Sequence, residues 1–531
     1  MDEIVEKDSN EQRISGRWAA IALIVLSILT SLGRVYTRNE PLERDLTMYA
    51  LVAHELVEGK RLYTDVWDQK PPAIYLVYAA AELAVGYGPQ SVLLVNIAAG
   101  LITLAGVYCA ASAAGMGRVS GLWAAGFWAI ISLNLELEAN QPNTEVFINA
   151  CMIWVFVIFV GAKEQPISYP KAVWLGLIAA AATLFKHHSF LPFATVSIAY
   201  IIGTAEAKQF RAGRLVSALI AFGTIVFCWA AVGGYFALGG RFKDFYDAVF
   251  LYNMSHPGNL FYNLADGLEP ERVKFLLLAV LPSAAAITAY FGGVLRRPVS
   301  PFTLMAGFAA GIFLEVSCTK WWFAHYFQLW LPALCVSLGW SYRLLDDMMS
   351  GKRGVRRLLP HIGVGMIVAP FLLSQLFIYR LTPLEIAIRK HEPNFPLFVV
   401  EADEINQILK PGESFYHFGD DTGLYYYAKR RPPVSVFWYY PLFMGPLTES
   451  LSKRVVADLE RNRPDMLVYR YTENLERFTP EWESNPVLQW YLDNYVPFPD
   501  NDSRDYYKLG ALKGSDLERR IFGNSGQDPN K

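Results

Sequence analysis

Long apolar runs are the feature of this chain that most restricts its fold. They lie near residues 17–36, 91–114, 119–138, 145–162, 171–203, 213–238, 272–292, 300–317, 322–346 and 358–379. Most of them reach the roughly 17–25 residues that a helix needs to cross a bilayer. Because 53% of the residues are hydrophobic and only 18% are charged, the expected solvent is the bilayer. The sequence therefore predicts a polytopic α-helical membrane protein with about 11 spans.

The run from Lys171 to Tyr200 is too long for one span and is interrupted by Lys186, His187 and His188. We expect two helices that meet at this polar apex. Every second loop is then basic, and basic loops stay on the cytoplasmic side during insertion. The outer side receives the loop from about 37 to 90, the turn 136–145, the apex 186–188, the stretch 239–271, the turn 318–322 and the C-terminal region.

Other signals concern the compartment and the class of partner. Residues 18–33 are expected to be a retained signal anchor, because no small-x-small cleavage pattern follows them. All five cysteines lie in or beside predicted spans, so the exported region has no disulfide to form, which weakly favours a bacterial inner membrane. A net charge of −2 gives no reason to expect nucleic acid.

The composition changes after Tyr379 to mixed polar, aromatic and proline-rich sequence. We therefore divide the chain into a transmembrane part, residues 1–379, and a small extracytoplasmic α/β domain, residues 380–531. The expected strands of this domain are Leu397–Val400, Ser414–Phe418, Val434–Tyr439 and Met466–Tyr469.

The first outer loop contains two segments with helical character. Met48, Leu51, Val52, Leu56 and Val57 recur at helical spacing, opposite His54, Glu55 and Glu58, which predicts an amphipathic surface helix that ends at Gly59. A second apolar stretch, residues 73–85, is too short to span and is expected to lie at the membrane interface. Such a loop would let an enzyme meet a lipid headgroup and an aqueous acceptor together.

Three parts of this loop carry a resemblance: Arg44–Tyr49, Gly59–Asp65 and Gln69–Pro72. They resemble the first extracytoplasmic loop of the GT-C glycosyltransferases, specifically the dolichyl-phosphate-mannose-protein mannosyltransferase family and its bacterial relatives, including aminoarabinose-transferase-like enzymes. That pattern is an acidic residue after the first span, a nearby Tyr, a helix ending in Gly, Tyr-x-Asp, and a Lys/Pro-Pro element. Further matches are Asn143–Glu145, Lys186, and His325 with Tyr326.

The resemblance implies transfer of a sugar from a polyprenyl-phosphate donor to an acceptor hydroxyl with inversion, which needs a base. Asp45 is the candidate, although an aspartate just outside a span is commonly a solvated helix end. The leaving phosphate needs electrostatic stabilisation, for which Lys70, Lys186 and Lys320 are candidates. Lys186 would alternatively be a snorkelling anchor.

Each of the remaining candidate residues also has a purely structural explanation. Glu145, preferred over Glu136 and Glu138 as the second acidic residue, also suits a helix N-terminus. His325 and Tyr326 lie in an aromatic segment typical of a membrane interface. The other supporting candidates are Tyr49, Tyr63 and Asp65, of which the last two would equally organise the loop.

No cofactor is predicted to be required. Two neighbouring histidines such as His187 and His188 point to different faces of a helix and make a poor zinc pair. No carboxylate cluster demands a divalent ion, although the family has members with and without metal dependence. Two other function classes stay open: a secondary transporter, which would show inverted repeats that are not evident here, and a non-catalytic protein that binds the lipid carrier.

Overall fold

The structure is a computed structural model of the chain. It describes residues 14–113, 115–162, 165–203, 211–254, 260–266, 269, 301–318, 321–349, 354–391, 395–470, 485–501, 504 and 506–523. The predicted span 272–292 and the predicted phosphate ligand Lys320 lie outside these residues.

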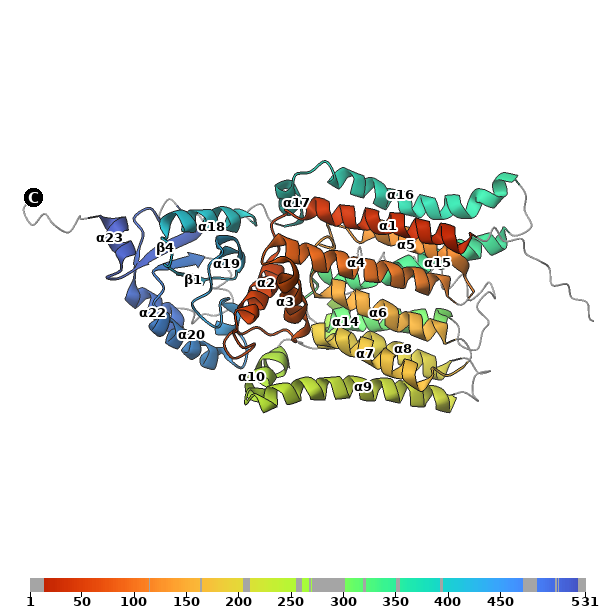
Figure 1. Ribbon diagram of the computed structural model, residues 1–531, viewed down its shortest axis with the longest axis horizontal. Coiled ribbons are helices and arrows are strands. Elements are labelled where there is room, and N and C mark those ends of the chain that lie inside the picture. The colour runs from red at the N-terminus through yellow and green to blue at the C-terminus, as the bar shows by residue number, and fades with distance from the viewer. Residues whose placement is uncertain are drawn as a thin grey trace, which may run out of the picture.

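Roughly parallel helices form a bundle, and a second unit with a small sheet sits at one end of it (Figure 1). In the described part of the chain, five helical segments are long and apolar enough to cross a membrane: α1 (Gly16–Thr37), α4 (Pro89–Ser112), α6 (Thr144–Gly161), α9 (Arg211–Leu238) and Gly354–Ile378, which contains α16 (Leu359–Ile378). Shorter helices complete the bundle: α5 (Gly117–Ile131), α7 (Tyr169–Phe185), α8 (Phe190–Ile202), α14 (Pro301–Ser317) and α15 (Leu331–Met348). The chain is a multi-pass α-helical membrane protein, as predicted.

The apolar run from Lys171 to Tyr200, predicted to break at Lys186–His188, does form two helices. Helix α7 ends at Phe185 because Lys186 turns to an extended conformation, with φ −156° and ψ 117°. A single 3-10 turn, η1 (His187–Ser189), leads into α8. The helix expected over 119–138 is shorter than predicted, because α5 ends at Ile131 and turns occupy residues 132–133 and 135–140.

Helices α14 and α8 approach each other closely through glycine. Gly307 and Gly311 are four residues apart and lie on the face of α14 that contacts α8. A Cβ atom on Gly311 would lie 2.4 Å from the Cα of Pro192 and 2.3 Å from the hydroxyl of Thr195. Small residues at this spacing let helix backbones approach within van der Waals distance in membranes.

The first loop forms α2 (Arg44–Val57) and α3 (Ala73–Val85), with a turn at Gly59, φ +89°. The prediction of a surface helix was wrong for α2, whose residues from Leu46 to Ala53 are all buried. Helix α3 covers one side of α2 and α19 (Gly423–Ala428) covers another. Glu55, assigned to the polar face, is buried and pairs with Arg431.

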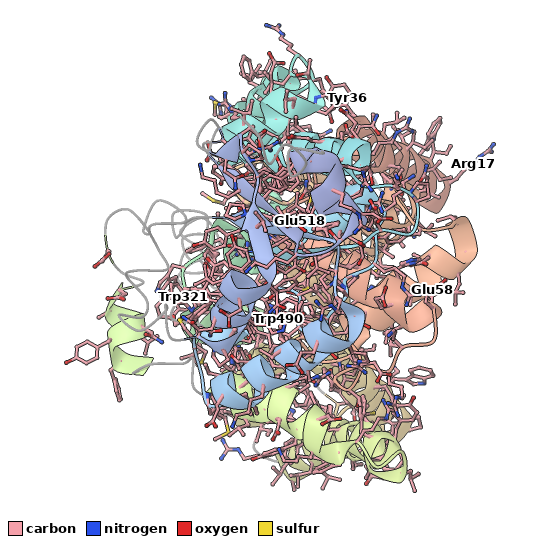
Figure 2. The ribbon with its side chains drawn as sticks, turned by 90° about the vertical axis from the view of Figure 1, so that its left-hand side faces the viewer. Arg17, Tyr36, Glu58, Trp321, Trp490 and Glu518 are labelled. Atoms are coloured by element: carbon pink, nitrogen blue, oxygen red, sulfur yellow. The ribbon has the colours of Figure 1, made fainter. Side chains whose placement is uncertain are left out.

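The residues after 380 form a four-stranded sheet in the order β1-β2-β4-β3. Strand β1 (Phe415–Phe418) is parallel to β2 (Met466–Arg470), and β4 (Tyr507–Leu512) pairs antiparallel with both β2 and β3 (Tyr495–Pro497). The helices around this sheet are α18 (Leu397–Ile408), α19, α20 (Thr448–Asn462), α22 (Pro486–Asn494) and α23 (Asp516–Phe522), whereas α17 (Pro383–Lys390) packs through Ile386 against Leu135 and Ile378 of the bundle. Seen along the bundle from this end, Trp490 and Glu518 lie in front of its middle (Figure 2).

Two of the four expected strands were correct, β1 and β2. Leu397–Val400 opens helix α18, whose buried residues Phe398, Ala402 and Ile405 follow helical spacing. Val434–Tyr439 forms no strand, because its backbone is bonded elsewhere: the carbonyl of Ser435 accepts a hydrogen bond from the amide of Trp67 at 2.8 Å. This contact joins the C-terminal unit to the first loop.

Replacing Gly311 by Ala should lower the stability of the protein by about 1–3 kcal/mol, because the new methyl group meets backbone that cannot move aside. The measurement is the thermal unfolding midpoint in detergent. Gly126→Ala in α5 is the control, since its Cβ atom would meet nothing within 4 Å. Equal midpoints for the two variants would contradict the close approach of α14 and α8.

Candidate active site

Asp45 lies in the first turn of α2, where hydrogen bonds fix the backbone and side chain. The carboxylate of the N-cap residue Glu43 accepts from the amide of Asp45 at 3.0 Å. The hydroxyl of Tyr49, one helical turn later, lies 3.3 Å from the Asp45 carboxylate and 3.2 Å from Asn143 Oδ1. The side chain of Asp45 is only partly buried, so an acceptor can reach it.

The charges around Asp45 favour its ionised form. Desolvation alone would raise the pKa of Asp45, but the positive charges of Lys70, Arg44 and His325 outweigh it and hold the pKa below the usual value. Desolvation and the nearby charge of Asp45 act in the opposite sense on Glu43 and raise its pKa to about 8. At neutral pH one carboxyl of this pair is therefore charged and the other protonated.

Lys186 and Glu145 form a buried ion pair. Lys186 Nζ lies 2.9 Å from Glu145 Oε1, and the two side chains are 9% and 0% exposed. The break between α7 and η1 directs Lys186 inward, while Asn143 caps α6 and places Glu145 in its first turn. Lys186 Nζ also lies 3.7 Å from the centre of the Tyr326 ring, a cation–π contact.

His325 pairs with the carboxylate of Glu138 in the same group of residues. It lies on the 3-10 helix η4 (Ala324–Trp330), and its Nδ1 is 3.3 Å from Glu138 Oε2. Glu138 has a positive φ of 53° in a turn, which aims its side chain inward, whereas Glu136 is exposed. The sequence predicts a turn at 136–145 but not the positive φ of Glu138 within it, so Glu145 was preferred over Glu138.

Lys70 is held by its backbone rather than by a counter-ion. The hydroxyl of Tyr63, a fully buried residue, donates to the carbonyl of Lys70 at 2.8 Å. Among the described residues, Lys70 forms no ion pair, so its ammonium group is available to an anion. Asp65, in contrast, bonds to the exposed Arg61 at 2.8 Å and only organises the loop.

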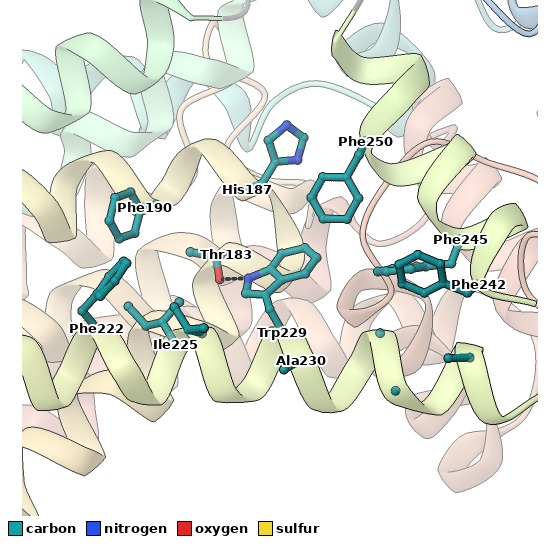
Figure 3. A pocket seen from close by; sticks show the side chains of 14 residues that line it. Thr183, His187, Phe190, Phe222, Ile225, Trp229, Ala230, Phe242, Phe245 and Phe250 are labelled. Atoms are coloured by element: carbon teal, nitrogen blue, oxygen red, sulfur yellow. Dashed lines mark hydrogen bonds between the residues drawn. The ribbon is translucent and has the colours of Figure 1, made fainter.

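An apolar pocket of about 670 Å³ is lined by His187, the next residue after Lys186, and by Thr183. Figure 3 shows His187, the neighbour of Lys186, at one side of it, with Trp229 and Phe250 close by. Its walls come from α7, η1, α8, α9, α10 (Phe242–Tyr246) and the π-helix η3 (Asp247–Leu251). Trp229 Nε1 donates to Thr183 Oγ1 at 2.9 Å, which leaves the indole ring facing the pocket. The lining is almost entirely hydrocarbon and aromatic.

The predicted residues thus meet from separate segments: Asp45 and Tyr49 on α2, Lys70 on the loop, Glu145 on α6, Lys186 after α7, and His325 and Tyr326 on η4. Tyr63 supports Lys70 from outside this group, and Asp65 lies away from it. Within the described ranges, no group of three or more His, Cys, Asp or Glu side chains is placed to hold a metal ion.

Lys186→Met should cost about 3–5 kcal/mol of folding stability, because Glu145 would be left buried without its partner. Glu145→Gln in the same chain should restore most of that loss. The measurement is the unfolding midpoint of the single and double variants in detergent. A double variant as unstable as Lys186→Met would contradict the mutual dependence of the two charges.

The Glu43 carboxyl predicts a pH dependence of stability. Burial and the charge of Asp45 raise the pKa of Glu43 to about 8, whereas the ordinary pKa of a glutamate in an unfolded chain is 4.5. The stabilising contribution of this proton is therefore full below pH 4.5 and is lost as the pH rises to about 8. Glu43→Gln should therefore show a smaller fall in unfolding midpoint between pH 5 and pH 8 than the native protein. Parallel profiles would contradict the raised pKa of Glu43.

Comparison with known proteins shows which fold the chain shares. No protein-family model and no curated protein sequence matches the chain. ArnT from Cupriavidus metallidurans, in its structure bound to undecaprenyl phosphate, is similar with a TM-score of 0.59 and 16% identity, over 94% of this chain and 98% of that one. Its apo structure gives a TM-score of 0.57 at 17% identity, over 93% and 98%.

The archaeal oligosaccharyltransferase AglB from Archaeoglobus fulgidus, solved with an inhibitory peptide and a dolichol-phosphate, is similar with a TM-score of 0.53 and 10% identity. The similarity covers 95% of this chain and 77% of that one. At sequence identities this low, the structural similarity establishes a shared fold and nothing more. The chain therefore has the fold of the GT-C glycosyltransferases, in agreement with the resemblance found in its first loop.

Proposed function

We propose that the protein is a membrane glycosyltransferase that moves a sugar from a polyprenyl-phosphate donor to an acceptor hydroxyl on the outer face of the membrane. The observation that carries the proposal is the meeting of a reachable carboxylate, Asp45, with the two lysines Lys70 and Lys186 beside a large apolar pocket. These parts occupy a fold shared with a protein solved with undecaprenyl phosphate. Residues 1–379 would form the catalytic part and residues 380–531 the extracytoplasmic domain.

The donor needs a site for its phosphate and another for its lipid. Lys70 has no competing ion pair among the described residues. Lys186 has three N–H donors and gives one to Glu145, so it also has capacity for a phosphate oxygen. The apolar pocket next to His187 suits part of a polyprenyl chain, whose burial is favourable by about 0.8 kcal/mol per CH₂ group. The pocket and the lysines together match an amphipathic donor.

The chemistry is a single displacement. The Asp45 carboxylate takes the proton of the acceptor hydroxyl while that oxygen attacks the anomeric carbon of the sugar. The bond between the anomeric carbon and the phosphate oxygen breaks, and its electron pair leaves with polyprenyl phosphate. Lys70 and Lys186 stabilise the negative charge that develops on the leaving group. The products are the glycosylated acceptor, with inverted configuration, and polyprenyl phosphate.

Donor binding would also tune the base. In the free protein Lys70 is the largest of the charges that lower the pKa of Asp45. A phosphate bound to Lys70 brings negative charge of its own and offsets this effect, so the pKa of Asp45 rises when the donor is in place. A base with a higher pKa accepts a proton more readily. The site therefore gains basicity when a donor is present.

Asp45→Asn should reduce sugar transfer by at least about 100-fold, because the amide cannot accept the proton. The assay follows release of undecaprenyl phosphate from a panel of undecaprenyl-phosphate sugars in the presence of hydroxyl acceptors. Asp65→Asn is the matched control on the same loop and should transfer at the native rate, since Asp65 bonds only to the loop. Full activity of Asp45→Asn would remove Asp45 from the mechanism.

Binding of undecaprenyl phosphate distinguishes the role of the lysines in donor binding from the role of Asp45 as the base. Lys70→Gln should weaken binding by about tenfold or more, since it removes a charge-assisted contact, while Asp45→Asn should bind at least as tightly as the native protein. The measurement is a titration of the detergent-solubilised protein. A native protein that binds undecaprenyl phosphate but transfers no sugar from any donor would instead be a non-catalytic carrier-binding protein.

A further inference from the structure

The short segment Glu40–Thr47, which carries Asp45, is bonded along its length to residues after 380. Lys390 Nζ lies 2.7 Å from Glu40 Oε1, and both side chains are completely buried. The amide of Leu42 donates to the hydroxyl of Tyr427 at 2.9 Å. Two further contacts follow on α2 itself: Arg44 Nη1 with Asp420 Oδ2 at 2.5 Å, and Thr47 Oγ1 with Thr422 Oγ1 at 2.8 Å.

The helical bundle holds the same segment from its other side. The amide of Glu43 donates to Gln141 Oε1 at 3.1 Å, and Gln141 Nε2 donates to the carbonyl of Pro41 at 3.1 Å. Asn140 Nδ2 donates to Glu40 Oε2 at 2.5 Å. The segment thus lies between the turn 140–143 and the C-terminal unit, and neither partner alone fixes both of its sides.

We infer that the C-terminal unit positions the base: Asp420, with Thr422, clamps the first turn of α2 through Arg44 and Thr47, and so sets the place and the basicity of Asp45. The inference rests on the proposed function for its catalytic meaning. Asp420 is a positioning residue, because it contacts Arg44 and not the reacting atoms. The clamp makes the activity of the membrane-embedded site depend on the docking of the C-terminal unit.

The geometry explains why Asp420 acts on position. Arg44 and Asp45 are consecutive, and the carbonyl of Arg44 accepts from Thr422 Oγ1 at 3.0 Å, so the backbone that carries Asp45 is itself held by the C-terminal unit. The Thr422 side chain is fully buried and the Asp420 side chain is 9% exposed. The Arg44 side chain is 35% exposed, so the contacts of the buried Thr422 are the rigid part of the clamp, because water cannot replace a partner lost there.

Asp420 also acts on basicity. Arg44 is one of the cations that lower the pKa of Asp45, and the Asp420 carboxylate compensates its charge. Without Asp420, the full charge of Arg44 would act on Asp45 and lower its pKa further. The other ionisable groups in electrostatic reach of Asp45 are Glu43 at the N-cap of α2, Tyr49 on α2, Lys70 and Asp68 on the loop, Tyr78 on α3, and His325 and Tyr326 on η4.

Hydrogen exchange of the full-length protein in detergent tests the clamp without any substrate. In Asp420→Asn, the amides of residues 42–49 should exchange about tenfold faster than in the native protein, because one charge-assisted contact is weakened. Asp420→Glu should restore much of the protection. Unchanged exchange of residues 42–49 in Asp420→Asn would overturn the clamp.

Arg431→Gln is the matched control, because Arg431 also follows residue 380 in the chain and contacts the same helix, α2. Arg431 bonds to Glu55 through two contacts of 2.7 Å, at the opposite end of α2, about 15 Å along the helix axis from Asp45. Its loss should speed exchange near residues 54–60 and leave residues 42–49 protected. Faster exchange over both regions in both variants would mean that the unit undocks as a whole, which would also overturn the specific role of Asp420.

The dependence of transfer rate on pH tests the effect on the base. The rate needs ionised Asp45, so its acidic limb should move to lower pH in Asp420→Asn, by about half a pH unit or more, with a reduced kcat. Arg431→Gln should keep the native limb. An unshifted limb in Asp420→Asn would refute the electrostatic role, whereas absence of transfer by the native protein would refute the proposed function and leave the exchange result to decide the clamp.

Discussion

The buried ion pair of Lys186 and Glu145 is the interaction on which the arrangement of the site depends. Burying either charge without the other would cost a large free energy. The first turn of α6, which carries Glu145, must therefore stay next to the C-terminal end of α7, which is followed by Lys186. At this pair α7 ends at Phe185, the chain continues into η1, and the Tyr326 ring lies against the ammonium group of Lys186. The same break opens the apolar pocket beside His187.

The spans were predictable because the bilayer imposes a simple rule of length and apolarity. Even the break at Lys186 was visible, since a cation followed by two histidines cannot continue an apolar helix at low cost. Helix α2 was different: its pattern of hydrophobic and polar residues was read correctly, but its polar face meets protein instead of water. Glu55 looks solvated in the sequence and is buried in the structure, because its partner Arg431 lies 376 residues away.

The same reason limits what sequence reveals about the site. Asp45, Lys70, Lys186 and Glu145 were identified from local pattern and resemblance, and the structure brings them together, while their roles stay predictions. Glu138 and Asp420 carry no local signal: one depends on a turn with positive φ, the other on docking of a separate unit. Leu397–Val400 was mistaken for a strand because four apolar residues fit either period until the following residues are packed.

The contacts along Glu40–Thr47 set an order of events during synthesis. Asp420 follows Arg44 by 376 residues, so at about 5–20 residues per second the ribosome needs roughly 20–75 s to supply the partner of a segment already threaded through the membrane. During that interval the nascent bundle holds the segment from one side only. A partly made chain in the membrane would therefore carry every polar group of the bundle and still lack a fixed carboxylate at position 45, so the site becomes complete only after residue 420 has been made.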